Sequence, residues 1–188
     1  MHLLDDSLSR DRQRDGELTA AMTERFVTLA TYAKNTGAKG ILFTCSAFGP
    51  AIEAAAKAVG IPALKPNEAM FAQALGVGRK LALIATFPPS IPSMSEELLL
   101  MARERGVTIE LQTAHVPGAM DDLAAGHATE HDRRIAQVAA NFGDCDAVML
   151  AQFSMAAAQR LAQAQLKCPV LTSPDCAVQA LRQTMRDA

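Results

Sequence analysis

The sequence predicts an α/β protein with parallel sheets. Short apolar segments alternate with longer amphipathic ones along the chain, which is the pattern of βα units. Glycine or proline separates most of these segments, as expected where a helix ends and a strand follows. Weak self-similarity within the chain is the third observation, and it predicts a fold of two similar halves.

The self-similarity becomes visible when the chain is shifted by 107 positions, the interval between Cys45 and Gln152. Without any gap, the segment ILFT then lies on VMLA, and the expected helix 51–59 lies on 158–166. The matched single residues are Pro62 with Pro169, Leu64 with Leu171, and Glu68 with Asp175. Any α/β protein shows a rough self-match, but matched prolines and acids favour duplication. We expect two parallel-sheet halves related by pseudo-two-fold symmetry, with the site in the cleft between them.

Composition argues against several classes of protein. With 18 Lys and Arg against 20 Asp and Glu, the chain offers no basic surface for nucleic acid. No apolar run is long enough to span a membrane, so we expect no membrane partner and a cytoplasmic protein. The four cysteines lack the CxxC spacing of zinc sites, so we expect reduced thiols and no metal.

The first half is expected at residues 1–76, joined by the C-terminal helix 174–188. Residues 1–4 resemble the end of a strand, and the charged stretch 5–16 is interpreted as a loop. Periodicity and caps then predict a helix at 18–35 capped by Thr19 or Thr23, a strand at 40–44, a helix at 51–59, a short strand at 63–64, and a helix at 67–75 capped by Asn67.

The second half is expected at residues 77–173. Apolar runs predict its strands at 80–85, 107–111, 147–151 and 169–172. Helical periodicity predicts helices at 92–105, 129–141 and 155–165, followed by the C-terminal helix, whereas 121–126 is a loop or a short helix. Ser93 with Glu96 has the spacing of a capping box, which would place the start of its helix there.

Cys45 is the candidate reactive residue because of its place between a strand and a helix. Ligands of open α/β sheets bind beyond the carboxyl ends of the strands. The start of the following helix favours an anion and therefore the thiolate, which is the reactive form of cysteine. A small cysteine buried as a hydrophobe is an equally open interpretation of this stretch.

Five segments, in this order, resemble the aspartate/glutamate/hydantoin racemase superfamily: LFTCSAFGPAIEAA, KPNEA, LIATFPPSIPSM, LAQFSM and LTSPDCAV. The resemblance is clearest for the aspartate/glutamate racemase branch. It implies cofactor-independent chemistry at the carbon next to a carboxylate. In members with two cysteines, one thiolate removes the α-proton and the opposite thiol delivers another, because inversion requires an acid and a base on opposite faces.

By the resemblance, Cys45 matches the first family cysteine, but Gln152 stands at the place of the second. An amide is neither a base nor a general acid at neutral pH. Members with one cysteine exist, and in arylmalonate decarboxylases loss of CO₂ creates the carbanion that a single thiol protonates. The expected substrate-binding residues are Thr44, Ser46, Thr86, Ser90, Gln152, Phe153 and Ser154, with Cys176 as an alternative second thiol.

Three hypotheses follow for a small carboxylate ligand: an amino-acid racemase using Cys45, a one-cysteine decarboxylase or isomerase, and a non-catalytic anion-binding protein. A fourth is a thiol redox sensor, which predicts no carboxylate ligand. The resemblance also implies a strand and a helix ahead of Met1 that this sequence lacks. The first half is therefore expected to be incomplete, with its open sheet position covered, for example in a homodimer.

Overall fold

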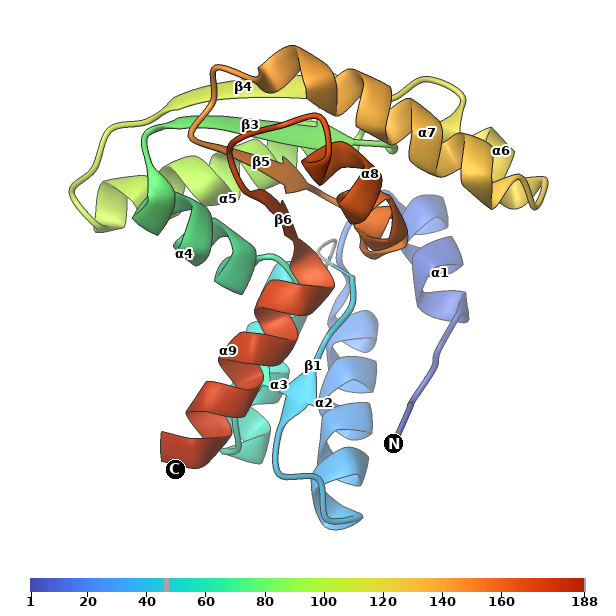
Figure 1. Cartoon of the computed structure of the whole chain (residues 1–188). Helices are drawn as coiled ribbons and strands as arrows, with labels where there is room; N and C mark the ends of the chain where they lie inside the picture. Colours follow the sequence, from blue (N-terminus) through green and yellow to red (C-terminus); the bar gives the residue numbers. More distant parts are fainter. Residues whose placement is uncertain (46–47, 188) are drawn as a thin grey trace. The chain divides into compact units, whose positions relative to one another are not determined.

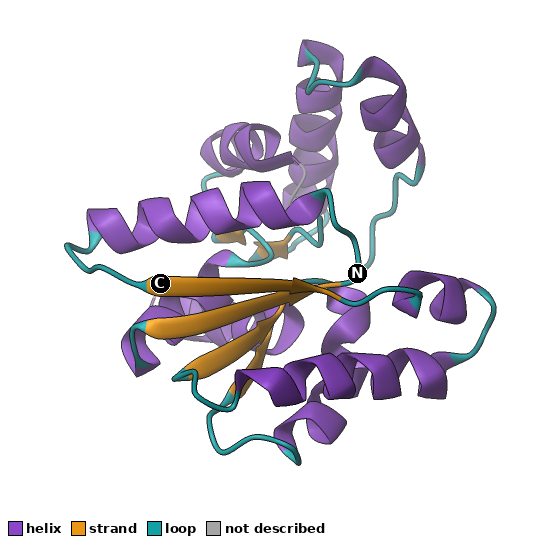
Figure 2. Ribbon diagram, turned by 90° about the horizontal axis from the view of Figure 1, so that it is seen from above, coloured by secondary structure: helices purple, strands orange, loops and turns teal. Residues whose placement is uncertain are grey.

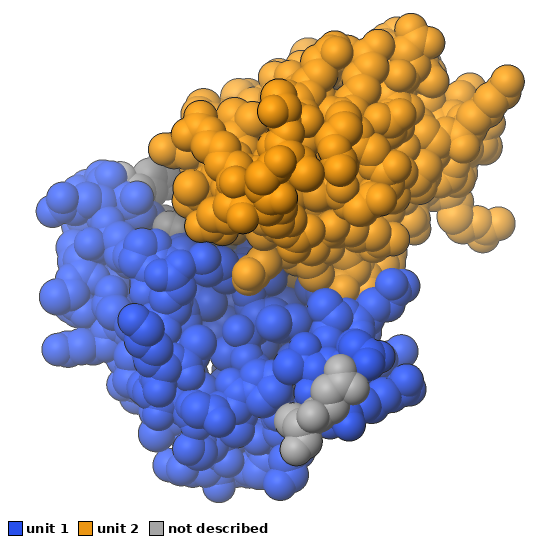
Figure 3. All heavy atoms as spheres, turned by 90° about the vertical axis from the view of Figure 1, so that its left-hand side faces the viewer, with its two compact units in different colours: residues 1–66, 177–188 blue, residues 67–176 orange. Residues whose placement is uncertain are grey.

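The computed structural model describes residues 1–45 and 48–187. It confirms an α/β protein in which all paired strands of the described chain are parallel (Figure 1). The chain forms two compact units, Met1–Pro66 with Ala177–Ala188, and Asn67–Cys176, coloured separately in Figure 3. None of the described helices is both long and apolar enough to cross a membrane.

The first unit is mainly helical around one pair of strands. Its elements are α1 (Ser7–Asp15), α2 (Ala20–Asn35), β1 (Ile41–Leu42), α3 (Gly49–Val59), β2 (Ala63–Leu64) and most of α9 (Ser173–Asp187). Thr19 caps α2 as expected, since its side chain accepts from the Met22 N–H at 3.3 Å. Phe26 packs on Phe48 and Phe43, with ring centroids 5.0 and 5.5 Å apart, and holds α2 against the start of α3.

The helix α1 corrects the expected loop at residues 5–16. Its sequence is charged, and among its residues whose burial is described Leu8 alone is buried, so no apolar period indicates a helix. The stabilising contacts come instead from Arg25 on α2, which donates to Asp5 Oδ2 at 3.0 Å through Nε and to Asp11 Oδ2 at 2.6 Å through Nη1. Tertiary ion pairs thus fix a helix that local sequence does not specify.

The second unit is a four-stranded parallel sheet with helices on both faces (Figure 2). The strands β3 (Lys80–Ala85), β4 (Glu110–His115), β5 (Ala147–Leu150) and β6 (Val170–Thr172) are ordered β4-β3-β5-β6. The helices are α4 (Glu68–Val77), α5 (Ser90–Glu104), α6 (Ala119–Ala124), α7 (Ala128–Ala139), the 3₁₀ turns η2 (Ala140–Phe142) and η3 (Phe153–Ala158), and α8 (Gln159–Gln163).

Successive side chains along β3 point to opposite faces of the sheet, so the core of the second unit has two layers. Leu81 and Leu83 pack with α4 and α5, whereas Ala82 and Ile84 pack with α7 and α8 on the other face. Side chains of a strand point to opposite faces in turn, so a strand buried on both faces must be continuously apolar. The run KLALIA satisfies this requirement, which is why β3 was predicted at its observed bounds.

The expected repeat is present in the strand pairing of the two units. In the first unit Ile41 pairs with Ala63, and the same shift of 107 carries this pair onto Val148 and Val170. One backbone hydrogen bond repeats as well: Ile41 N–H donates to Pro62 O at 2.8 Å, and Val148 N–H to Pro169 O at 3.0 Å. Each unit therefore contains the same strand–helix–strand module in the same register.

The predictions for the start of β4 and the start of α5 are wrong. The strand expected at 107–111 lies at Glu110–His115, because the turn after α5 takes up residues 105–109. Ser93 does not begin α5, since this helix starts at Ser90 and Ser93 Oγ donates back to the Ser90 carbonyl oxygen at 3.1 Å. A hydroxyl inside a helix often bonds the preceding turn in this way, so a capping pattern alone does not locate the start.

Candidate functional site

Cys45 lies in the loop that follows β1 in the first unit. The Phe43 N–H donates to the Leu64 carbonyl oxygen at 3.1 Å, which extends the strand pairing to the residue before Thr44. Thr44 and Cys45 are both exposed, and α3 begins four residues after Cys45, at Gly49. The structure thus excludes the buried interpretation of Cys45. Ser46, the third expected residue here, lies outside the described residues.

In the second unit, three of the expected residues form one hydrogen-bonded group. Gln152 Oε1 accepts from the Thr86 backbone N–H at 2.9 Å and from Thr86 Oγ1 at 3.3 Å. Its Nε2 donates to Ser90 Oγ at 2.8 Å, and Ser90 Oγ in turn donates to the Phe87 carbonyl oxygen at 2.7 Å. Because a backbone N–H can only donate, this contact fixes which end of the Gln152 amide faces β3.

The polar group lies where two neighbouring strands end. Thr86 follows β3 directly, and Gln152 comes two residues after the end of β5, its pairing neighbour. An amide nitrogen carries two hydrogens, and Ser90 takes one of them. Within the described chain no acceptor contacts the second hydrogen, which can donate to an anion. Phe153 is half-buried and Ser154 is exposed, both in η3 just after Gln152.

A second polar cluster at the end of β6 was not selected from the sequence. Thr172 Oγ1 donates to Asp175 Oδ2 at 2.6 Å, and Ser173 Oγ donates to Asn67 Oδ1 at 2.5 Å. Asn67, Thr172 and Ser173 are all buried. The sequence does contain an indication of this cluster, because the hydroxyl residues Thr172 and Ser173 directly follow the apolar residues Val170 and Leu171. Asn67 precedes α4 as expected, but its side chain bonds Ser173 and caps no helix.

The remaining cysteines are less accessible than Cys45. Cys176 is buried and lies 3.0 Å from Gln73 Oε1, to which its thiol donates. Burial raises the pKa of the Cys176 thiol, and burial likewise raises the pKa of Cys145 and Cys168. These three groups therefore favour the protonated thiol. Among the described residues, no group of three or more His, Cys, Asp or Glu side chains could hold a metal ion.

These features define a class of α/β proteins with polar and thiol side chains at the carboxyl ends of parallel strands. Within that class, the chain belongs to the Asp/Glu/hydantoin racemase family, whose sequence description matches residues 2–183. The family membership expected from the five segments is thereby confirmed. Comparison with curated protein sequences gave no match.

Solved structures of enzymes share this fold at low sequence identity. Unliganded arylmalonate decarboxylase has a TM-score of 0.66 and 18% identity over 90% of this chain and 77% of the other. Allantoin racemase from Klebsiella pneumoniae has a TM-score of 0.65 and 20% identity over 88% and 66%. A maleate isomerase variant from Pseudomonas putida S16, solved with maleate, has a TM-score of 0.63 and 15% identity over 89% and 72%. At these identities the likeness establishes the fold.

Proposed function

We propose that this chain is a cofactor-independent enzyme that acts at the carbon next to a carboxylate of a small amino acid or related acid. Cys45 is the proton-transferring group, because it is an exposed thiol beyond the carboxyl end of β1. The family comprises racemases by its description, and proteins of this fold include a decarboxylase and an isomerase by name. All three reactions rearrange bonds at such a carbon.

The carboxylate of the substrate requires donors that hold it while negative charge develops on the neighbouring carbon. The unused hydrogen of Gln152 Nε2 is one such donor, oriented by the contacts with Thr86 and Ser90. Preorganised donors stabilise a developing anion without reorganisation during the reaction. Thr44, Ser46, Phe153 and Ser154 complete the proposed substrate-binding set.

The observation that carries the proposal is that the two copies of the repeated module have different residues, Cys45 and Gln152, at the same position. Cys45 and Gln152 occupy equivalent positions, each after the first strand of a module whose strand register is the same. A thiol transfers protons, whereas an amide only holds hydrogen bonds. Racemisation by two thiols therefore lacks its second acid in this chain.

A second candidate function follows from the same pair, namely a one-cysteine decarboxylase or isomerase. Loss of CO₂ from a substituted malonate creates the carbanion without a base, so one thiol is sufficient to protonate it. Cys176 is a weak candidate for the missing acid, because its thiol is buried and donates to Gln73.

Proton NMR in D₂O tests the proposal with a panel of aspartate, glutamate, hydantoins, allantoin, maleate and substituted malonates. The readouts are α-proton exchange, optical rotation and CO₂ release, with Cys45→Ala as the control. Exchange with inversion would support a racemase and require a second acid. Exchange with retention, or CO₂ release, would support the one-cysteine enzyme. Equal inactivity of both proteins, with unchanged ligand affinity in Cys45→Ala, would favour a binding protein instead.

A further inference from the structure

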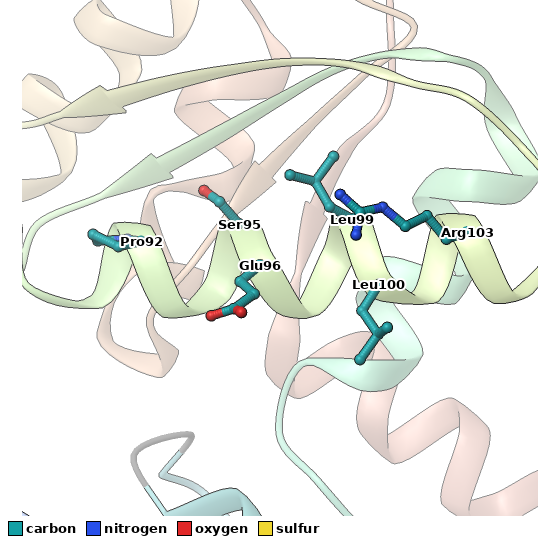
Figure 4. Close-up of a pocket in the computed structure, with 6 residues that line it drawn as sticks. All are labelled: Pro92, Ser95, Glu96, Leu99, Leu100 and Arg103. Atoms are coloured by element: carbon teal, nitrogen blue, oxygen red, sulfur yellow. The ribbon is translucent and has the colours of Figure 1, made fainter.

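One face of α5 is directed away from the core of the second unit and is exposed at Pro92, Glu96, Leu100 and Arg103. Met94, Leu98 and Ala102 on the opposite face are buried against the sheet. The outward stripe surrounds a shallow hollow of about 320 Å³, lined by Pro92, Ser95, Glu96, Leu99, Leu100 and Arg103 (Figure 4). Positions 92, 96, 99 and 103 follow the spacing of one helical face.

The centre of this stripe is apolar. Leu100 is 53% exposed and Leu99 is half-buried, and both lie between Glu96 and Arg103 along the helix. A large aliphatic side chain gains stability when it is removed from water. A single exposed leucine is ordinary on a protein surface, so this feature alone does not indicate a partner.

The charges at the two ends of the stripe are opposite and unpaired. Glu96 lies on one side of the leucines and Arg103 on the other, and both are exposed. Within the described chain neither residue makes an ion pair. They are seven residues apart, roughly 10 Å along the helix, which is too far for them to pair with each other.

We propose that this face of α5 is a homodimer interface in which two copies of the helix pack antiparallel. A two-fold axis between Leu99 and Leu100 brings each Glu96 opposite the Arg103 of the second copy, since both lie 3.5 residues from the axis, about 5 Å along the helix. The leucines of the two copies then meet at the centre. A two-fold interface requires such self-complementarity, with residue i opposite j and j opposite i.

The occupant is a second copy because the charge pattern is complementary to its own reverse. This complementarity is a property of the helix paired with itself, and it does not favour an unrelated peptide or small ligand. Since only residues of α5 are involved, the inference is independent of the proposed function. One helix pair forms a small interface, below about 1,200 Å² in total, so we expect a weak dimer.

Charge reversal tests the pairing. Sedimentation equilibrium of the 20.0 kDa chain is measured at about 1–100 μM, where a small interface associates. Glu96→Arg and Arg103→Glu each place like charges opposite one another in both pairs. Each single change is expected to raise the dissociation constant by about tenfold or more, and the double variant E96R/R103E is expected to return to within about threefold of the original.

Glu24→Arg, an exposed reversal on α2, is the matched control and is expected to leave association unchanged. Circular dichroism confirms that each variant folds, since all three positions are on the surface. A monomer throughout the concentration range would overturn the inference. So would a dimer indifferent to the single reversals, or a double variant that fails to recover, because a different face or partner would then be responsible.

Discussion

Gln152 accepts a hydrogen bond from the Thr86 backbone N–H at 2.9 Å, so a side chain beyond β5 satisfies the main chain at the end of β3. Thr86 is buried, and its N–H has no other acceptor among the contacts of the described chain. The amide of Gln152 therefore has a structural role in addition to any role toward a substrate, and substitutions can separate the two.

Gln152→Ala is expected to lower the free energy of unfolding by about 1–3 kcal/mol, because a buried backbone N–H loses its partner. Gln152→Glu keeps an acceptor for Thr86 and should cost less stability. It replaces the free amide hydrogen by negative charge, so it should weaken binding of a carboxylate ligand more than Gln152→Ala does. Urea unfolding and ligand titration separate these effects. Equal losses in both measurements would contradict the divided role.

Gln152→Cys is expected to introduce a second proton-transferring group at the position equivalent to Cys45. If the chain exchanges a substrate α-proton with retention, this variant should add inversion, detectable as decay of optical rotation. Gln152→Ser is the control of similar size without a thiol. Unchanged stereochemistry in Gln152→Cys, in a protein of normal stability, would argue that the two positions do not act on one carbon.

Thiol reagents are expected to modify Cys45 first. The reactive form is the thiolate, and Cys45 is exposed, whereas burial raises the pKa of Cys176. With iodoacetamide near pH 7.5, Cys45 should react at least about tenfold faster than Cys176. The modification of Cys176 should accelerate as the pH rises. Peptide mass mapping over time gives both rates, and comparable rates at neutral pH would refute the assignment.

Gly78 is required by close approach. A Cβ at this position would lie 2.2 Å from Asp146 Cβ, and Asp146 Oδ2 accepts from the backbone N–H groups of Arg79 at 2.7 Å and Lys80 at 2.9 Å. Gly78→Ala should destabilise the protein by about 1–3 kcal/mol, as overpacking does. Gly76→Ala is the matched control, since a Cβ there meets nothing within 4 Å.

The clash at Gly78 can be checked by a double-mutant cycle with Asp146→Gly, which removes the Cβ that the new side chain would meet at 2.2 Å. If Gly78→Ala acts through this clash, the double variant should be scarcely less stable than Asp146→Gly alone. Additive losses would show that the glycine is needed for a different reason. Chemical denaturation of the four proteins provides the comparison.

Arg25→Ala is expected to destabilise the first unit in a pH-dependent way. Hydrogen bonding from Arg25 holds the pKa of Asp5 below its ordinary value. A carboxyl group with a lowered folded-state pKa stabilises the fold above its unfolded pKa, about 3.9. The contribution is lost as the pH falls through the lower folded-state value. The difference in melting temperature between wild type and Arg25→Ala should thus be largest near neutral pH and shrink below about pH 3.9.

The Arg25→Lys variant and the pH dependence of the stability difference both test this interpretation of Arg25. Arg25→Lys should recover only part of the stability, since one ammonium group cannot replace a guanidinium that contacts Asp5 and Asp11 with different nitrogens. A stability difference that stays constant from pH 7 to well below pH 3.9 would show that packing of the arginine stem, and no ion pair, is responsible.

Much of the fold was predictable because it depends on local patterns. The run KLALIA specified β3, and Thr19 was one of the two residues predicted to cap α2. The helix α1 was missed because Arg25, distant in sequence, stabilises it. The strand β4 was misplaced because its alternating apolar residues continue from the preceding turn, and only pairing with β3 selects the register.

In the candidate site, the individual residues could be predicted from the sequence but their contacts could not. Thr86, Ser90 and Gln152 were selected one by one, and the structure joins them through the Gln152 amide. Which hydrogen bonds they make could not be predicted, because these depend on two strands being neighbours and on the depth at which each one ends. The cluster of Asn67 and Ser173 was missed for a related reason, since its two residues are 106 positions apart.

The shared register of the pairs Ile41–Ala63 and Val148–Val170 has an evolutionary consequence. Two copies of equal length can diverge by substitution alone, with no need to reshape the scaffold. Chemical asymmetry can then arise at one position, so that one copy carries a thiol at Cys45 and the other an amide at Gln152. Exchanging residues 41–64 with 148–171 would change no connection length, and such a chimaera would separate what the framework contributes from what each copy has acquired.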